Sequence, residues 1–469
     1  MRTPPSAAQM HLTRAFKTTA YKISLGLVPP PRTQGWIRPF CQLAVANTAS
    51  NIMVPLAGLI DTAFLGHLSE VRFLNGVALA TVIFNVIYWS FNFFRMGTTG
   101  PTAQAVGKNH EMEVWLIGIR NALLALGTGI GVWLLQQPIA TLGFALLQAS
   151  PGVREAAIAF FNGRIIGAPA VLVNFVLLGW LLGRSKGRAV IVLAIIGNSS
   201  NIVLDYWFIK QLGWGSYGAG LATAISQYLM LVAGLVVIFV GSIPWHLWPQ
   251  VQAQLWQPAA LRSLFGLNRN ILIRTFALVI SISLFTNLSS GLGETVLGVN
   301  TLLMQIFLMA SYFIDGIALA VESYAGRFYG QRSTADLHWL LLLGIVGSMG
   351  LGLAIALTLL IWPVPFFRLL TSHTSLLTSI PTYVAWLIPV LGLGAIAFTL
   401  DGYFLGLTAG HILRNSTLTA AIFGFLPVAL LASSLQQPHL LWLALVGLMA
   451  IRVTTLIQQV PQTLTTTNT

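Results

Sequence analysis

Five acidic side chains lie inside long apolar stretches of this sequence, and they are the residues best suited to chemistry. The chain has 11 acidic residues, and these five are Asp61, Asp205, Asp315, Glu322 and Asp401. A carboxylate near the centre of a membrane costs about 2.5–3.5 kcal/mol even on insertion scales. Such residues are rare and typically mark a path for an ion or a proton. The alternative is a structural acid that is hydrogen-bonded inside a helix bundle.

Asp61 belongs to the stretch NIMVPLAGLIDTAFLG at residues 51–66, which is apolar enough to lie in a bilayer. Pro55, six residues earlier, removes a backbone hydrogen bond and predicts a hinge in the helix. Gly58 lies three residues before Asp61, on the same helical face. Burial disfavours the charged form of a carboxylate. Asp61 is therefore a candidate proton carrier on a helix that can bend.

A second acid lies in the run GNSSNIVLDYWF, where Asn198, Asn201 and Asp205 share one face of a helix. Two amides and a carboxylate on one face can hold a proton in a hydrogen-bond network, or they can supply oxygen ligands to a cation. Thr223, in the next apolar stretch, could join them. This region is the second candidate for an ion or proton site.

Other polar residues are candidates for substrate binding or gating. A polar stripe at mostly helical spacing runs through one apolar stretch and consists of Thr81, Asn85, Trp89, Asn92 and Thr99. The stripe either lines a cavity or forms hydrogen bonds between helices, each worth about 0.6 kcal/mol. Asp315 and Glu322 are seven residues apart and share a face. The candidates in this group are Asn85, Asn92, Asn174, Asp315, Glu322 and Asp401.

The elements that must position these residues are membrane-spanning helices. Of the 469 residues, 56% are hydrophobic and 7% are charged, and the mean hydropathy is +0.80. A soluble protein has about 25% charged residues, and apolar runs of about 20 residues indicate helices instead of barrel strands. The predicted spans are 37–64, 76–106, 114–136, 154–183, 188–210, 217–241, 262–290, 296–328, 337–361, 380–407, 413–435 and 438–459.

Composition also excludes several classes of function. The net charge is +13, but the basic residues are spread over loops, and no soluble domain exists to hold nucleic acid. The single cysteine, Cys41, excludes an internal disulfide. The eight histidines fall outside the spans or near their ends, so we predict no buried metal cluster and no cofactor.

The distribution of basic residues predicts the orientation. With both termini in the cytoplasm, 17 basic residues, among them Arg274 and Arg452, are assigned to inside segments and 4 to outside segments. This asymmetry follows the positive-inside rule and supports twelve spans with both ends inside.

A weak repeat divides the chain into halves of six spans. Gly107 and Gly330 close the second and eighth spans, and Gly183 and Gly406 close the fourth and tenth, at an offset of about 223 residues. An even number of spans per half makes the repeat parallel. The expected fold is an all-α integral membrane protein with twelve transmembrane helices in two six-helix lobes, related by a pseudo-twofold axis along the membrane normal.

We predict the following organisation: a basic, disordered tail at 1–35, an N-terminal lobe at 36–241, a cytoplasmic linker at 242–261, a C-terminal lobe at 262–460 and a tail at 461–469. Residues 1–35 contain five basic residues and no acid. They form either a cytoplasmic tail, which places the protein in the inner (plasma) membrane, or a transit peptide, which would place it in a plastid membrane.

Several stretches together resemble the multidrug and toxic compound extrusion (MATE) family, in particular its DNA-damage-inducible protein F branch. The matching stretches are NIMVPLAGLIDTAFLGHL, FRMGTTGPTAQAVG, APAVLVNFVLLGWLLG, GNSSNIVLDYWF with GLATAISQ, LNRNILIR, YFIDGIALAVESYAG and LDGYFLG. They run in order from about residue 36 to about residue 460. The resemblance implies two six-helix lobes around a central cavity, and drug efflux coupled to H⁺ or Na⁺.

The resemblance also implies a cation-coupling site in the N-terminal lobe, at Asp61, Asn201, Asp205 and Thr223. Na⁺-coupled members of the NorM branch use a second acid pair in the C-terminal lobe, of which only Asp401 has a counterpart here. We therefore expect H⁺ as the main coupling ion, with Na⁺ binding at the four N-lobe residues as the alternative. No other metal is expected.

Two rival functions remain from the sequence. A lipid-linked glycan flippase of the same superfamily would line its cavity with basic residues, but the spans offer only Arg95, Arg120 and Arg164. A membrane-embedded enzyme would need a clustered catalytic constellation, which the sequence lacks. The expected partners are small amphipathic, cationic substrates and the lipid bilayer. We expect a monomer.

Overall fold

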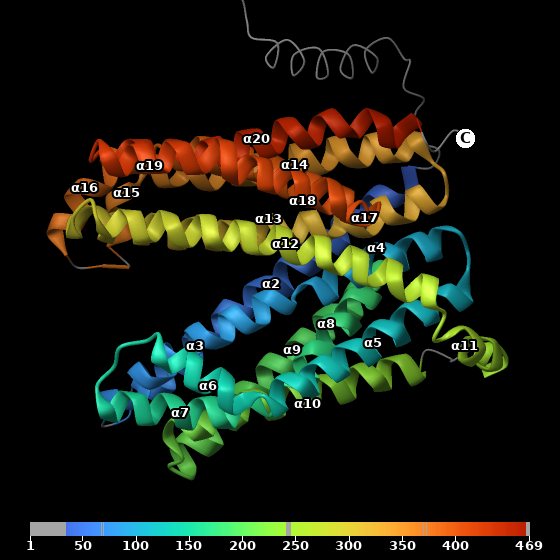
Figure 1. Cartoon of the computed structure of the whole chain (residues 1–469), viewed down its shortest axis with the longest axis horizontal. Coiled ribbons are helices and arrows are strands. Elements are labelled where there is room, and N and C mark those ends of the chain that lie inside the picture. Colours follow the sequence, from blue (N-terminus) through green and yellow to red (C-terminus); the bar gives the residue numbers. More distant parts are fainter. Residues whose placement is uncertain are drawn as a thin grey trace, which may run out of the picture. The chain divides into compact units, whose positions relative to one another are not determined.

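The structure is a computed structural model that describes residues 34–66, 68, 70–240, 245–368, 370–371 and 373–465. These residues form helices and contain no strand, which confirms the predicted all-α class (Figure 1). The predicted basic tail lies outside the described residues, except that Gln34–Trp36 form the short helix η1. At the other end, α20 continues into the predicted C-terminal tail as far as Thr465, and residues 466–469 lie outside the description.

Most of the predicted spans appear as long apolar helices. Within the described ranges, ten helices are long and apolar enough to cross a membrane. A helix pair bent by 53°, α7 and α8, raises the number to eleven, and it corresponds to the predicted span at 154–183. The first predicted span corresponds to α2, a 30-residue helix that carries Asp61.

The chain forms two compact units. The amino-terminal unit is residues 45–268, and the carboxy-terminal unit combines the residues up to 44 with residues 269–469. The boundaries lie inside two helices, between Ala44 and Val45 in α2 and between Asn268 and Arg269 in α12. Each of these helices therefore contributes residues to both units.

The amino-terminal unit begins within α2 (Ile37–Gly66) and ends within α12 (Pro258–Ser290). Its other helices are α3 (Val71–Phe91), α4 (Phe93–Gly107), α5 (Glu111–Leu134), α6 (Gln136–Ala145), α7 (Pro151–Ile165), α8 (Ala168–Gly183), α9 (Gly187–Asp205), η2 (Tyr206–Gln211), α10 (Gly215–Val240), η3 (Trp245–Leu247) and α11 (Trp248–Gln254). The predicted linker at 242–261 thus contains η3, α11 and the start of α12. Helices α7 and α9 pack against α10, and α4 and α5 pack against α8.

The carboxy-terminal unit holds the rest of α12 and the helices that follow it. These are α13 (Glu294–Gly330), α14 (Thr334–Ile361), α15 (Pro363–Phe367), α16 (Thr374–Val384), α17 (Leu387–Gly406), α18 (Gly410–Thr419), η4 (Ala420–Phe425), α19 (Leu426–Ser434) and α20 (Pro438–Thr465). Helix α17 packs against α13, α14 and α20, and Figure 1 shows these helices running beside one another. Buried side chains of α13, α17 and α20 form much of the core of this unit.

The repeat predicted from glycine positions is present in the helices themselves. Helices α5 and α14 start at Glu111 and Thr334, and α10 and α20 start at Gly215 and Pro438, so both pairs keep the offset of the glycines. Connections also recur at this offset. Asn109 after α4 and Arg332 after α13 both have a positive φ. The same holds for Ser185 after α8 and Thr408 after α17. The two halves of the chain therefore share one order of helices and turns.

Equivalent pairs of glycines bring helices close together in the two units. A Cβ added at Gly402 or Gly406 of α17 would clash with the backbone of α13, at the carbonyl oxygens of Ala318 and Glu322. Gly179 and Gly183, at the equivalent positions of α8 in the first half, approach the backbone of α4 in the same way. Small residues four apart let helix backbones approach closely inside membranes. The motif in DGYFLG is thus a packing device.

Candidate functional site

The amino-terminal unit brings two of the predicted acids together. Asp61 on α2 is half-buried and Asp205, the last residue of α9, is fully buried. Their side chains form a hydrogen bond with each other, although the two residues lie far apart in the chain. An ionised carboxylate only accepts hydrogen bonds, so a bond between two carboxyl groups requires a proton on one of them. Two carboxyl groups in such contact are a candidate site for one shared proton.

Asn201 supports the pair from one helical turn before Asp205. Its Nδ2 donates a hydrogen bond to Asp205 Oδ2 at 3.0 Å, and both residues are buried. The other predicted partners bond elsewhere. Asn198 Nδ2 donates to the carbonyl oxygen of Ala194, and the Thr223 hydroxyl donates to that of Ala219, each within its own helix. The described contacts therefore join three of the four predicted coupling residues.

A half-buried arginine supplies the positive charge of this site. Arg164 lies near the end of α7 and interacts electrostatically with Asp61. Its guanidinium lies 4.6 Å from the ring centroid of Phe84 and 5.7 Å from that of Tyr88. Such cation–π contacts stabilise a desolvated cation. Within the described residues, Arg164 Nε has no hydrogen-bond partner. The site thus combines two carboxyl groups with one fixed cation.

The predicted hinge at Pro55 and the polar stripe lie on and between helices α2, α3 and α4. Helix α2 runs unbroken through Pro55. In the stripe, the hydroxyls of Thr81 and Thr99 donate to carbonyl oxygens four residues earlier, and Asn92 lies between α3 and α4. Asn85 is exposed. The side-chain hydrogen bonds described for the stripe therefore each stay within a single helix.

Asn174 joins two helices of the amino-terminal unit. Its Nδ2 donates to the backbone oxygen of Gln227 at 2.9 Å and to the side-chain oxygen of the same residue at 3.0 Å. Asn174 lies in α8 and is buried, while Gln227 lies in α10. These contacts join α8 to α10, and the substrate or gating role of Asn174 stays a prediction.

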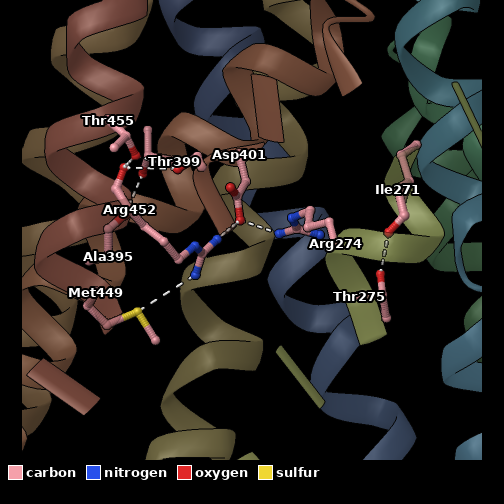
Figure 2. A network of polar contacts seen from close by, with 10 residues as sticks. Ile271, Arg274, Thr275, Ala395, Thr399, Asp401, Met449, Arg452 and Thr455 are labelled. Carbon is pink, nitrogen blue, oxygen red and sulfur yellow. Dashed lines mark hydrogen bonds and ion pairs between the residues drawn. The ribbon is translucent and has the colours of Figure 1, made fainter. Parts of the chain in front are cut away.

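Asp401 forms a different kind of site in the carboxy-terminal unit. Figure 2 shows the guanidinium groups of Arg274 on α12 and Arg452 on α20 meeting its carboxylate from two sides. Both arginines contact the same oxygen, Oδ2. The side chains of all three residues are at least nine-tenths buried. Arg452 also approaches the sulfur of Met449 at 3.7 Å.

The ion-pair network corrects one sequence-based assignment. The positive-inside argument assigns Arg274 and Arg452 to cytoplasmic segments, but both are buried within helices. Burying three charged groups has a large desolvation cost, which only close pairing offsets. The number of basic residues on the predicted cytoplasmic side falls from 17 to 15, against 4 on the outer side. The predicted orientation therefore keeps its support.

The other two acids of the carboxy-terminal unit both lie on α13. Asp315 is half-buried and acts electrostatically on Arg452, which extends the charge network of Asp401. Glu322 is 1% exposed, and its backbone oxygen lies against Gly406. In the described part of the chain, no group of three or more His, Cys, Asp or Glu side chains is arranged to hold a metal ion.

Sequence reasoning missed the three arginines that complete these sites. From the sequence, Arg164 is only a basic residue within a span, and the orientation argument assigns Arg274 and Arg452 to cytoplasmic segments. Hydropathy averages over a window and does not show which face of a helix a single arginine occupies. A cation at mid-helix depth could still have been read as the partner of a buried acid.

The MatE family profile matches residues 48–207 and 271–431, two segments whose starting points keep the offset of the repeat. The chain is 36% identical over 410 residues to DNA damage-inducible protein F of Escherichia coli, an alignment that covers 87% of this chain and 89% of that protein. It is 27% identical over 370 residues to Protein DETOXIFICATION 44, chloroplastic, of Arabidopsis thaliana, with 76% and 69% covered. It is 21% identical over 418 residues to a probable multidrug resistance protein NorM of Thermotoga maritima, with 87% and 86% covered.

Solved structures share the fold. A crystal structure of MATE in the bent conformation superposes with a TM-score of 0.82 at 19% identity, covering 92% of this chain and 97% of that one. An outward-facing multidrug resistance MATE transporter of the MOP superfamily gives a TM-score of 0.79 at 19% identity, with 92% and 96% covered. Both likenesses cover the two units and the repeat described above.

Proposed function

Because the chain belongs to the MatE family of multidrug and toxic compound extrusion transporters, we propose that it is an antiporter exporting amphipathic organic cations in exchange for protons. The family consists of transporters and not of enzymes. The observation that carries the proposal is the hydrogen-bonded carboxyl pair of Asp61 and Asp205, with Arg164 beside it.

Exchange follows from the charge of this pair. Two adjacent carboxyl groups do not both ionise at low cost, so one proton remains shared between them until another cation compensates for its loss. When the proton leaves, the site gains one negative charge, and Arg164 offsets only part of it. A cationic substrate then supplies the missing positive charge, and a returning proton displaces that substrate. Proton and substrate therefore exclude each other, which is the condition for antiport.

The same arrangement favours a proton over Na⁺. A hard cation needs several oxygen ligands held around it, but Asn201 turns its amide nitrogen and not its oxygen to Asp205, and the described hydrogen bond of Thr223 stays within its own helix. Arg164 adds a repulsive positive charge next to Asp61. In the carboxy-terminal unit, Asp401 is already paired with two arginines.

Alternating access would bring the pair to each side of the membrane in turn. We propose that protonation from outside bends α2 at Pro55 and releases the substrate, and that deprotonation inside restores the loading state. The driving free energy is about 2.3 kcal/mol per charge for each 100 mV, plus any pH difference.

The decisive experiment is dye transport in proteoliposomes under imposed gradients. A pH difference without Na⁺ should drive transport, and a Na⁺ gradient without a pH difference or membrane potential should not. Asp61→Asn and Asp205→Asn should each abolish proton-driven transport, because an amide cannot carry the proton. Glu70→Gln, a change at an exposed acid paired with Arg72, is the matched control. Transport driven by Na⁺ alone would reject proton coupling, and wild-type transport by either Asp variant would reject the site.

A further inference from the structure

An apolar groove with a volume of about 310 Å³ lies in the amino-terminal unit, between α5, α8 and α10, with η3 and α11 along one side. Every lining residue is apolar or aromatic, apart from a glycine, and four are tryptophans: Trp115, Trp180, Trp245 and Trp248. No lining residue belongs to α2 or α9, the helices that carry Asp61 and Asp205. The groove is therefore separate from the carboxyl pair.

Specific hydrogen bonds hold the walls of this groove. Trp180 Nε1 donates to the carbonyl oxygen of Val114 at 2.8 Å, which fixes the Trp180 ring against α5. Arg120 of α5 donates to the carbonyl oxygens of Leu255 at 2.9 Å and Gln254 at 2.5 Å. Arg120 thereby ties the end of α11 to α5. The segment that closes the groove is therefore held to α5 by hydrogen bonds.

One end of the groove is basic. The guanidinium of Arg184 lies 4.4 Å from the ring centroid of Trp180 and 6.0 Å from that of Trp115. Burial and the neighbouring Arg184 lower the pKa of Lys186. The acid acting on Arg184 is Glu111, but no salt bridge between described residues includes Arg184 or Lys186. Two cations close to each other are thus available to an anionic group.

We propose that this groove binds an anionic membrane phospholipid, with one acyl chain along the tryptophans and the phosphate against Arg184 and Lys186. The occupant follows from chemistry at both ends of the site. A wholly apolar groove on a membrane-spanning unit meets acyl chains, and tryptophans gather where acyl chains give way to headgroups. Basic pockets between transmembrane helices bind anionic headgroups.

The proposed lipid has a structural consequence for the connection between the repeats. Trp245 and Trp248 belong to the segment that leads from the first repeat to the second. A bound acyl chain would fill the space between this segment and α5, α8 and α10. The lipid would therefore hold the connecting segment on the amino-terminal unit, together with Arg120.

Native mass spectrometry of the full-length protein tests lipid binding directly, by titration with phosphatidylglycerol or phosphatidylcholine. We expect one tightly bound phosphatidylglycerol and a roughly tenfold preference over phosphatidylcholine. Two basic residues near an anionic headgroup together raise the affinity by at least about tenfold. The double variant Arg184→Gln, Lys186→Gln should lose the preference. The matched variant Arg154→Gln, Lys210→Gln changes two exposed basic residues that do not line the groove, and it should keep the preference.

A second set of variants tests the acyl-chain part of the site. Ala122→Phe, or Val173→Phe on the neighbouring helix, would fill the groove and leave both basic residues in place. Either variant should lose the bound lipid while unfolding at a temperature near that of the wild type. Equal binding of the two lipids by the wild type would overturn the proposal. An unchanged preference for phosphatidylglycerol in the Arg184→Gln, Lys186→Gln variant would also overturn the proposal. This measurement decides the question even if the groove-filling variants do not fold.

Discussion

Arg164 is the cation of the proposed coupling site. It is held by the rings of Phe84 and Tyr88 and acts on Asp61 without a direct salt bridge among the described contacts. An arginine in a bidentate ion pair would neutralise Asp61 permanently. An arginine at longer range only lowers the cost of the second negative charge. In the proposed mechanism, Arg164 therefore assists deprotonation and still leaves the pair able to take up a proton.

We expect Arg164→Met to reduce proton-driven efflux by roughly tenfold, equivalent to about 1.4 kcal/mol. Without the cation, the deprotonated pair lacks its counter-charge, so each cycle waits longer for proton release. Arg164→Lys keeps the charge and should retain most of the activity. Initial rates of dye transport under a fixed pH difference measure both effects. If the lysine variant were as defective as the methionine variant, a role for the charge would be rejected.

The contacts of Asp401 favour the stabilising role over the gating role, the two alternatives that the sequence leaves open. Two buried arginines depend on its one carboxylate. Removing one partner from a buried ion pair costs about 3–5 kcal/mol, because a buried charge is left without compensation.

Asp401→Asn should therefore destabilise the protein by about 3–5 kcal/mol. Arg452→Met should cost less, because Arg274 still pairs with Asp401 in that variant. Denaturant unfolding of the purified protein gives both values, with transport measured in parallel. An Asp401→Asn variant with wild-type stability and no transport would point instead to a direct role in coupling.

At the scale of single elements, α9 ends at Asp205, one acid of the proposed coupling site. Asp205 is its last residue, and the chain continues as the π-helical turn η2 at Tyr206–Gln211. Single π-helical turns inside helices are frequent at functional sites. Here the change in helix geometry directly follows Asp205, so η2 contributes to the direction from which Asp205 approaches Asp61.

The contact of α13 with α17 depends on glycine, and Gly402→Ala tests it. The added Cβ would clash with the backbone oxygen of Ala318, and a rigid helix backbone cannot move aside as a side chain can. We expect a loss of about 1–3 kcal/mol, as for other overpacked interiors. Gly350→Ala in α14 is the control, because nothing lies within 4 Å of its added Cβ. Equal unfolding midpoints for the two variants would contradict the packing role.

At the scale of the whole chain, the repeat of helices and turns predicts membrane topology. Lys108 and Gln331 occupy equivalent exposed positions, after α4 and after α13. In a parallel repeat, both should lie on the same face of the membrane, and the basic residues place that face in the cytoplasm. Glu70, before α3, should lie on the opposite face.

Cysteine labelling in intact cells checks this topology. The exposed native cysteine is first removed by Cys41→Ser. Lys108→Cys and Gln331→Cys should then resist an impermeant reagent, and Glu70→Cys should react with it. Reaction of only one of the first two would exclude a parallel repeat. Reaction of both, with protection of Glu70→Cys, would reverse the orientation.

The sequence by itself determined the class of protein, the approximate helices, the repeat and the acids that lie at membrane depth. These properties depend on hydrophobicity and spacing along one chain, and a run of apolar residues must form a helix in lipid because its backbone groups have no other partners. The stretches around Asp61 and Asp205 were identified in this way, as was the offset between the two halves.

Only the tertiary structure decided which charges meet. Asp61 lies beside Asp205, and Asp401 lies between Arg274 and Arg452, although these residues come from helices far apart in the chain. Hydropathy gives the depth of a residue in the membrane, but not the rotation of its helix or the identity of its neighbour. Those depend on how side chains and glycines pack between helices. For this reason three candidate acids of similar appearance in the sequence divide into a pair of adjacent carboxyl groups and a buried ion-pair network.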